Sequence, residues 1–586
     1  LQADGTPIEN FSIWQDFLNV GEANTHNRQL TVNYELPLSK LPFLSFLKSS
    51  YTYTGDYQWQ RASEALQAFT DVNGLTYNLG NTIQNNSAHR LNTTLNMDLF
   101  YRYIGLTGKK TKQPNKPAAA PKPGEKVVAQ KAAVQNERGV FMTGLIGVLT
   151  SVKNVQVNYT ETAGTILPGY LPGLGFFGSS KPSLGFVFGS QADVRYEAAK
   201  NGWLTNYPDF NGNYSQVLSK TIDATANIDL FPDFKIDLVA NRTYVNNQSE
   251  QFDVSDGNYN PRAPYEFGNF SISTNLIRTA FSKSDETTSA AFDDFRENRL
   301  LVAQRLAAQR GLDPTDIDAD GFPNGYGKNS QQVLLPAFMA AYVGQDARDV
   351  SLSPFRDFPI PNWNIKYSGL MRYKFFKDRF KRFSLQHGYR ASYTINAFRS
   401  NFEFDNNPNG LDAGGNFFSR TIISNINLVE QFNPLIKIDM EMQNSMKVTA
   451  ELKKDRALSL SFDNNLLTEV QGMEYIIGLG YRIKDVIFNS ALADNPTGVI
   501  KSDINLRADF TLRNNKTIVR YLDYDNNQLG GGQNLWNLKL TADYSFSKNF
   551  TAIFFYDHSF SKAVISTAFP ITNIRSGFTL RYNFGN

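Results

Sequence analysis

The sequence contains no cysteine among its 586 residues, which excludes disulfide scaffolds, thiolate metal sites and cysteine nucleophiles. Long apolar runs are also lacking. The longest candidate, 139–152, contains glycine and falls short of the roughly 20 residues that a membrane-spanning helix needs. An excess of charge of one sign is lacking too, because the chain has 58 basic and 55 acidic residues. Nothing in this balance favours nucleic acid as a partner.

Aromatic residues are abundant, with 45 Phe and 28 Tyr, whereas charged residues make up only 19% of the chain. A disordered chain would show the opposite balance. The mean hydropathy is −0.38, which excludes only those membrane proteins that cross the bilayer by helices. The strands of a closed barrel alternate between lipid and water, and therefore their average is not hydrophobic.

Most of the chain alternates apolar and polar residues with the period of a β-strand, so each strand has one apolar and one polar side. We predict seventeen strands, at 28–37, 45–59, 90–107, 153–162, 218–231, 235–248, 362–375, 383–399, 419–432, 435–452, 457–464, 474–482, 501–513, 517–524, 535–546, 550–562 and 573–584. On this pattern alone, a large soluble sandwich or propeller remains the alternative.

The connections between the strands differ in length. Short turns are predicted at 36–44, 230–235, 375–383, 432–435, 513–517 and 546–550, and longer connections such as 163–217 and 249–361 alternate with them. Short turns at one end and long loops at the other are typical of outer-membrane barrels. We therefore predict an all-β fold, a transmembrane antiparallel β-barrel with its short turns in the periplasm. Seventeen strands would place residue 1 on the other side, which predicts the C-terminal part of a longer barrel.

Five segments are predicted along the chain. They are barrel strands in 1–108, a periplasmic Lys/Pro/Ala linker with a short apolar segment in 109–152, barrel strands in 153–248 with a Gly-rich extracellular loop at 163–217, an extracellular insertion with helices in 249–361, and barrel strands in 362–586. The linker is a solvated tether by composition. The Gly-rich loop is expected to fold over, or into, the barrel mouth.

The clearest helical pattern, 289–311, is followed by the sequence Asp-Ile-Asp-Ala-Asp-Gly at 316–321. This D-x-D-x-D-G spacing is that of a calcium loop. The predicted ligands are Asp316, Asp318, Asp320 and Asn324. The twelfth position is Gly327 rather than the bidentate Glu of a complete EF-hand, so an acidic surface turn remains the alternative reading.

Catalytic motifs are not recognisable in the sequence. The four histidines (His26, His89, His387 and His558) are scattered, without metal-ligand spacing and without a G-x-S-x-G elbow. We therefore expect that the protein is not an enzyme and that it uses no cofactor apart from a possible calcium ion.

Several short stretches are more distinctive, namely 12–18 (SIWQDFL), 34–42 (YELPLSKLP), 57–59 (YQW), 322–327 (FPNGYG), 336–342 (PAFMAAY), 361–363 (PNW) and 478–484 (GLGYRIK). They resemble the C-terminal region of the SprA/Sov family, the outer-membrane translocon of the type IX secretion system. The resemblance covers most of the chain, and family members are several times longer.

The resemblance implies a protein-conducting pore in the bacterial outer membrane that passes folded cargo to the cell surface, including adhesins in gliding bacteria. The implied partners are a PorV-like barrel, a periplasmic plug protein, an accessory lipoprotein or prolyl isomerase, cargo with a C-terminal targeting domain, and membrane lipid. Two other functions stay open: a small-solute porin or transporter, and a surface adhesin or structural β-protein.

Overall fold

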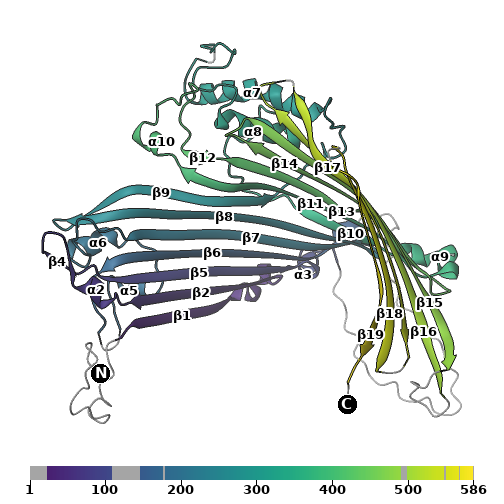
Figure 1. Ribbon diagram of the computed structural model, residues 1–586. Coiled ribbons are helices and arrows are strands. Elements are labelled where there is room, and N and C mark those ends of the chain that lie inside the picture. Colours follow the sequence, from purple (N-terminus) through teal and green to yellow (C-terminus); the bar gives the residue numbers. More distant parts are fainter. Residues whose placement is uncertain are drawn as a thin grey trace, which may run out of the picture.

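The chain is mostly β-structure, as Figure 1 shows. The computed structural model describes residues 23–107, 146–175, 178–313, 315–489, 498–524, 526–546, 549–565 and 568–584. Within these residues, seventeen strands form one antiparallel sheet, and β3 (Phe69–Thr70) and β4 (Thr76–Tyr77) form a separate pair. The predicted all-β, antiparallel fold is confirmed.

The strands of the large sheet are longer than those of an average globular sheet. They are β1 (Thr25–Leu36), β2 (Leu47–Gln60), β5 (Asn81–Asn96), β6 (Val152–Tyr170), β7 (Asn213–Phe231), β8 (Phe234–Ser255), β9 (Asn258–Ser273), β10 (Asn362–Tyr367), β11 (Phe380–Ser400), β12 (Thr421–Ile423), β13 (Asn425–Met442), β14 (Lys447–Ser461), β15 (Leu466–Asn489), β16 (Val499–Tyr521), β17 (Asn527–Ser545), β18 (Phe550–Ala563) and β19 (Ile571–Tyr582).

Helices are few and mostly short. Those that lie wholly within the described residues are α2 (Glu64–Gln67), α3 (Met97–Tyr103), α5 (Leu184–Val187), α6 (Arg195–Lys200), α7 (Ala290–Gln309), α8 (Gln331–Val343), α9 (Lys374–Arg379) and α10 (Phe402–Asn406), with 3-10 turns at Pro37–Lys40, Pro42–Leu44 and Gly369–Arg372. In the described part of the chain, no helix has the length and apolar character needed to cross a membrane.

Two rows of the sheet are interrupted. Both β9 and β10 pair with β8 on one side and with β11 on the other, so they lie end to end in a single row. In the same way, β12 and β13 occupy successive stretches along β11. Counting each interrupted pair once leaves fifteen rows among the described residues. Of these rows, β1 and β19 each pair on one side only.

The connections define two ends of the sheet. At one end, which we name the turn end, lie the short connections 37–46, 232–233, 443–446 and 546–549, together with the longer connections 97–151 and 368–379. The opposite end, named the loop end, carries the longer connections 61–80, 171–212 and 401–420, together with some short ones. Three of the six predicted short turns, 36–44, 230–235 and 546–550, are confirmed and lie at the turn end, whereas the predicted turn 375–383 covers α9 and the first residues of β11.

The other two predicted turns, 432–435 and 513–517, are wrong because they lie inside β13 and β16. Pro434 has no N–H group to donate, and β13 accommodates it through an irregular register between Phe432 and Ile436. Asn514 and Asn515 keep their pairing on both sides of β16. Both stretches contain turn-forming residues that continue the ladder instead.

The two faces of the sheet differ in character, because residues that pair across strands point to the same side. One side carries, in consecutive register on β1, β2, β5, β6 and β7, Tyr34, Tyr51, Leu91, Tyr159 and Ile222. The same side carries, on β14 to β18, Leu452, Tyr475, Leu512, Trp536 and Phe560. We name it the apolar face. The residues that alternate with these form the polar face.

Both buried cores lie on the apolar face, toward the loop end. In the first core, α7 and α8 pack against wall residues that include Tyr389, Leu428, Leu458 and Leu467. In the second core, the 171–212 connection packs against wall residues that include Tyr57, Trp59, Ile83 and Phe252. The Gly-rich segment therefore covers the apolar face of the wall rather than its polar face.

The helical insertion is shorter than predicted. Residues 249–255 belong to β8, and β9 occupies Asn258–Ser273, so the insertion covers only 274–361. The insertion lies between β9 and β10, in the middle of one row, and two side chains there bond to the backbone of the neighbouring strands. Ser273 Oγ accepts the backbone N–H of Asn241 at 3.1 Å, and Asn362 Oδ1 accepts that of Ala391 at 2.8 Å. Most of the predicted 109–152 linker, and the stretch 12–18, lie outside the described residues.

Candidate functional site

The predicted calcium ligands lie in a tight turn within the insertion, and each is engaged by a neighbour. Asp318 Oδ1 accepts the backbone N–H groups of Asp320 and Phe322 at 2.8 and 2.9 Å. Asn324 donates to Asp316 at 2.8 Å, and Lys328 approaches Asp320 at 3.1 Å. Among the described residues, no three His, Asp or Glu side chains gather as a metal would require. Calcium binding stays a prediction.

In the turn-end half, the apolar face is exposed. Its large side chains form a band that we name the apolar belt: Val32, Tyr34, Leu91, Ile436, Tyr475, Ile477, Leu479, Leu506, Phe510, Phe578 and Leu580. Ile477 is 49% exposed and Phe578 is 76% exposed. Exposed large apolar side chains on β1, β5, β13, β15, β16 and β19 mark a surface that is covered by another apolar medium or partner.

The polar face carries charges that neutralise one another. Across β13 to β16, acidic and basic side chains alternate at ion-pair distance, in the order Lys437, Glu451, Lys453, Glu474, Arg513 and Asp455. The separations range from 3.0 Å for Arg513–Asp455 to 4.0 Å for Lys453–Glu474. Because these side chains remain partly exposed, water screens each pair, and this network of three acidic and three basic side chains carries no net charge.

A hollow of about 760 Å³ opens on the polar face near the turn end. It forms where Gly478 and Gly480 of β15 lack side chains, between the rows of β14 and β16. Its walls carry both signs of charge, including Lys447, Arg507 and Asp509. The hollow is open to the surrounding water and contains no buried polar group aimed into it, so we assign it no ligand.

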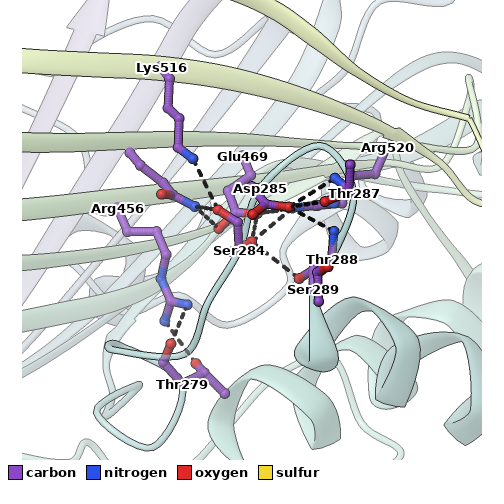
Figure 2. A network of polar contacts seen from close by, with 11 residues as sticks. Thr279, Ser284, Asp285, Thr287, Thr288, Ser289, Arg456, Glu469, Lys516 and Arg520 are labelled. Atoms are coloured by element: carbon purple, nitrogen blue, oxygen red, sulfur yellow. Dashed lines mark hydrogen bonds and ion pairs between the residues drawn. The ribbon is translucent and has the colours of Figure 1, made fainter.

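The insertion is fastened to the apolar face by a segment that we name the strap, residues 274–289 (Figure 2). Ser284 Oγ donates to Glu469 Oε2 at 2.6 Å and accepts from Arg520 Nη2 at 2.8 Å. Its carbonyl oxygen accepts from Gln471 at 3.1 Å and from Lys516 at 3.2 Å. One serine of the strap therefore binds four side chains of β15 and β16.

A second attachment lies at Thr279. Arg456 Nη1 donates to the Thr279 carbonyl oxygen at 2.9 Å, and Nη2 donates to the Thr279 hydroxyl at 2.8 Å. Arg456 also pairs with Glu430 at 3.0 Å. Glu430 in turn accepts from the hydroxyl of Tyr389 at 2.8 Å, and this hydroxyl accepts the Leu276 N–H at 2.7 Å. Both ion pairs under the strap, Arg456–Glu430 and Arg520–Glu469, are buried.

The tip of the strap is ordered by Asp285. Its carboxylate accepts the backbone N–H groups of Thr287 and Thr288 at 2.9 and 2.8 Å, and the Thr287 hydroxyl at 2.8 Å. Hydrogen bonds from Lys283 and Thr287 stabilise the ionised form and hold the pKa of Asp285 well below its usual range. This turn presents Ser284 to the wall.

The 171–212 connection has a comparable attachment at α6. Arg195 forms an ion pair with buried Glu250 of β8 and donates to Asp193 at 2.9 Å. Tyr259 of β9 donates to the same Glu250 at 2.6 Å. Burial alone would lower the pKa of Arg195, but the hydrogen bonds to Asp193 and Glu250 and the electrostatic attraction of Tyr214 raise it above its usual value. Neither attachment was predicted, because the paired residues are far apart in the sequence.

No family model matches the chain, and no curated protein matches it. Solved structures that resemble it include the copper transporter OprC (8% identity, TM-score 0.25), the RagAB peptide transporter (7%, 0.26) and the FrpB iron transporter from Neisseria meningitidis (9%, 0.23). The matches cover 96%, 88% and 94% of this chain, but only 65%, 49% and 63% of those proteins. At such scores the likeness bears on neither cargo nor partners.

Proposed function

We propose that this chain is part of the wall of an outer-membrane β-barrel that conducts proteins to the cell surface, as the translocon of type IX secretion. The observation that carries the proposal is the two-faced sheet, with an exposed apolar belt on one side and a charge-balanced polar face on the other. Lipid against the belt and water against the polar face would satisfy both sides at once.

The energetics favour lipid on the belt. Each Val, Leu, Ile or Phe moved from water to an apolar medium contributes about 1.5–3 kcal/mol. The belt exposes such residues on β1, β5, β13, β15, β16 and β19. The corresponding strands exceed the roughly 9–11 residues that cross a bilayer at a tilt, for example β15 at 24 residues.

The polar face suits transit rather than retention. The charges of its β13–β16 network are already paired with one another, so a polypeptide that slides past this part gains little from binding and is not held. The resemblance of 34–42, 322–327 and 478–484 to the SprA/Sov family supports the more specific assignment to type IX secretion. A PorV-like barrel, a plug protein, a lipoprotein or prolyl isomerase, and cargo with a C-terminal targeting domain are the proposed partners.

Adjacent residues of β16 allow a matched test. Asn505 and Leu506 are both exposed but point to opposite faces, and the chain has no cysteine that would give background labelling. In cells that export a stalled cargo, we expect a crosslink from Asn505→Cys on the polar face and none from Leu506→Cys in the belt. Crosslinks of equal yield at both positions, or from Leu506→Cys alone, would contradict conduction along the polar face.

Purification of the full chain in mild detergent tests the partners. We expect a second barrel and C-terminal-domain cargo to copurify with it. A complete small pore that passes only solutes, without either partner, would favour the porin function instead. A chain that stays in solution without detergent would favour a surface adhesin.

A further inference from the structure

The base of the insertion, where the chain leaves and rejoins the wall, is unusually apolar for an exposed surface. Four side chains define it, and we name them the rim: Ile277, Phe281, Phe358 and Ile360. Phe281 is 59% exposed and Phe358 is 88% exposed. Elsewhere the insertion buries most of its large apolar residues against α7, α8 and the wall, with Leu300 and Ile317 as exposed exceptions.

Contacts with the wall fix the height of the rim. The Phe281 ring lies 5.2 Å from that of Phe432, and Lys454 Nζ lies 4.5 Å from the Phe281 ring centre. The N–H of Ile360 donates to the Ser273 carbonyl oxygen at 3.0 Å. Phe281 therefore lies against β13 and β14 on the same face as the apolar belt, and the backbone of Ile360 is attached to the end of β9.

The belt begins directly below the rim. Phe432 pairs with Lys454, and the next paired residues toward the turn end are Ile436 and Leu452. Leu452 pairs in turn with Tyr475, which is exposed. Along β13, Phe432 and Ile436 therefore form an apolar path from the belt to Phe281 of the rim, whereas on β14, β16 and β17 the same row carries Lys454, Asn514 and Asn534.

Basic and aromatic side chains accompany this boundary. Lys454 and Lys516 both lie on the apolar face at its upper limit, and Lys454 extends over the Phe281 ring. Aromatic residues beside lysine are typical of the headgroup region of a bilayer. There the ring contacts the apolar part of the lipid and the ammonium group contacts phosphate.

From this arrangement we infer that the rim is a lipid-binding surface, which rests on the bilayer and holds the insertion at a fixed height. The inference rests on the proposed membrane location of the belt. The ligand is a phospholipid or lipopolysaccharide surface with anionic headgroups. If the rim were held above the bilayer, water would be trapped between two apolar surfaces, and contact of both with lipid removes that cost.

Spin labels on single cysteines test this in the full chain reconstituted in anionic lipid bilayers. We expect labels at Phe281→Cys and Phe358→Cys to be more accessible to oxygen, which partitions into lipid, than to a water-soluble nickel chelate. Leu300→Cys, on the exposed side of α7, is the matched control and should favour the nickel chelate.

Two further positions separate the inference from the proposed function. Leu506→Cys in the belt should favour oxygen, and Asn505→Cys on the polar face should favour nickel. If Leu506→Cys favours nickel, the belt is not in lipid and the proposed function fails. If Leu506→Cys favours oxygen while both rim positions match Leu300→Cys, the rim does not touch lipid and only the inference fails.

Discussion

At the scale of single residues, Glu469 and Arg520 are charged groups held where water does not reach, with side-chain exposures of 1% and 0%. Their attraction offsets the cost of taking both charges out of water, and does little more. What the pair contributes is position, because both partners also bind Ser284. A fully apolar contact would let the strap settle in several registers, whereas two charges and one hydroxyl allow only one.

Removing one partner should cost much more than removing both. In Glu469→Ala, Arg520 stays buried without its counter-charge, and we expect a loss of about 3–5 kcal/mol in the free energy of unfolding. The double variant Glu469→Leu with Arg520→Leu should recover a large part of this loss. Urea unfolding of the reconstituted protein, followed by tryptophan fluorescence, measures both.

The control is an exposed pair on the polar face. Asp509 pairs with Arg507 at 2.6 Å, and the Arg507 side chain is 71% exposed. Asp509→Ala should therefore change the free energy of unfolding by less than about 1 kcal/mol. An equally small effect of Glu469→Ala would contradict the assigned role of the buried pair.

At the scale of elements, alternation predicts strands well where it is unbroken. The predicted 550–562 matches β18 (Phe550–Ala563), and the predicted helix 289–311 matches α7. Alternation fails at β9, because prolines and charged residues interrupt its pattern. Its strand geometry comes from β8 and β11, to which it pairs across long sequence distances.

The candidate site was harder to predict than the fold. Ser284 and Arg520 are 236 positions apart, and no spacing rule connects them. The same holds for Thr279 and Arg456, which are 177 positions apart. A hairpin signal, in contrast, was present and missed. The Asp256-Gly257 dipeptide joins β8 to β9 with both residues at positive φ, as two-residue turns require.

This hairpin gives a prediction at the level of one element. Gly257 has φ +74°, and a Cβ there would meet nothing closer than 3.7 Å, so only the backbone opposes a side chain. Gly257→Ala should lower the free energy of unfolding by about 1–2 kcal/mol. Gly257→Asn should cost less, because Asn tolerates this conformation. Gly531→Ala in β17, which meets open space without positive φ, is the control in the same urea unfolding assay.

At the scale of the whole molecule, the apolar face is covered by protein toward the loop end and exposed toward the turn end. Both added structures, the insertion and the 171–212 connection, cover the apolar face toward the loop end. The apolar belt occupies the other half and is left exposed. In Figure 1, α7 and α8 lie together at the upper ends of β14 and β17, away from α9. If a bilayer surrounds the belt, the insertion and the 171–212 connection both lie on the same side of that bilayer.

The side is set by the turns, since short turns of outer-membrane barrels lie in the periplasm. Asp378 in α9 lies at the turn end, and Asn406 in α10 lies at the loop end, and both are exposed. A membrane-impermeant maleimide added to intact cells should label Asn406→Cys and leave Asp378→Cys unlabelled until the outer membrane is opened. Labelling of Asp378→Cys alone in intact cells would place the insertion in the periplasm, and the rim would then meet the inner leaflet.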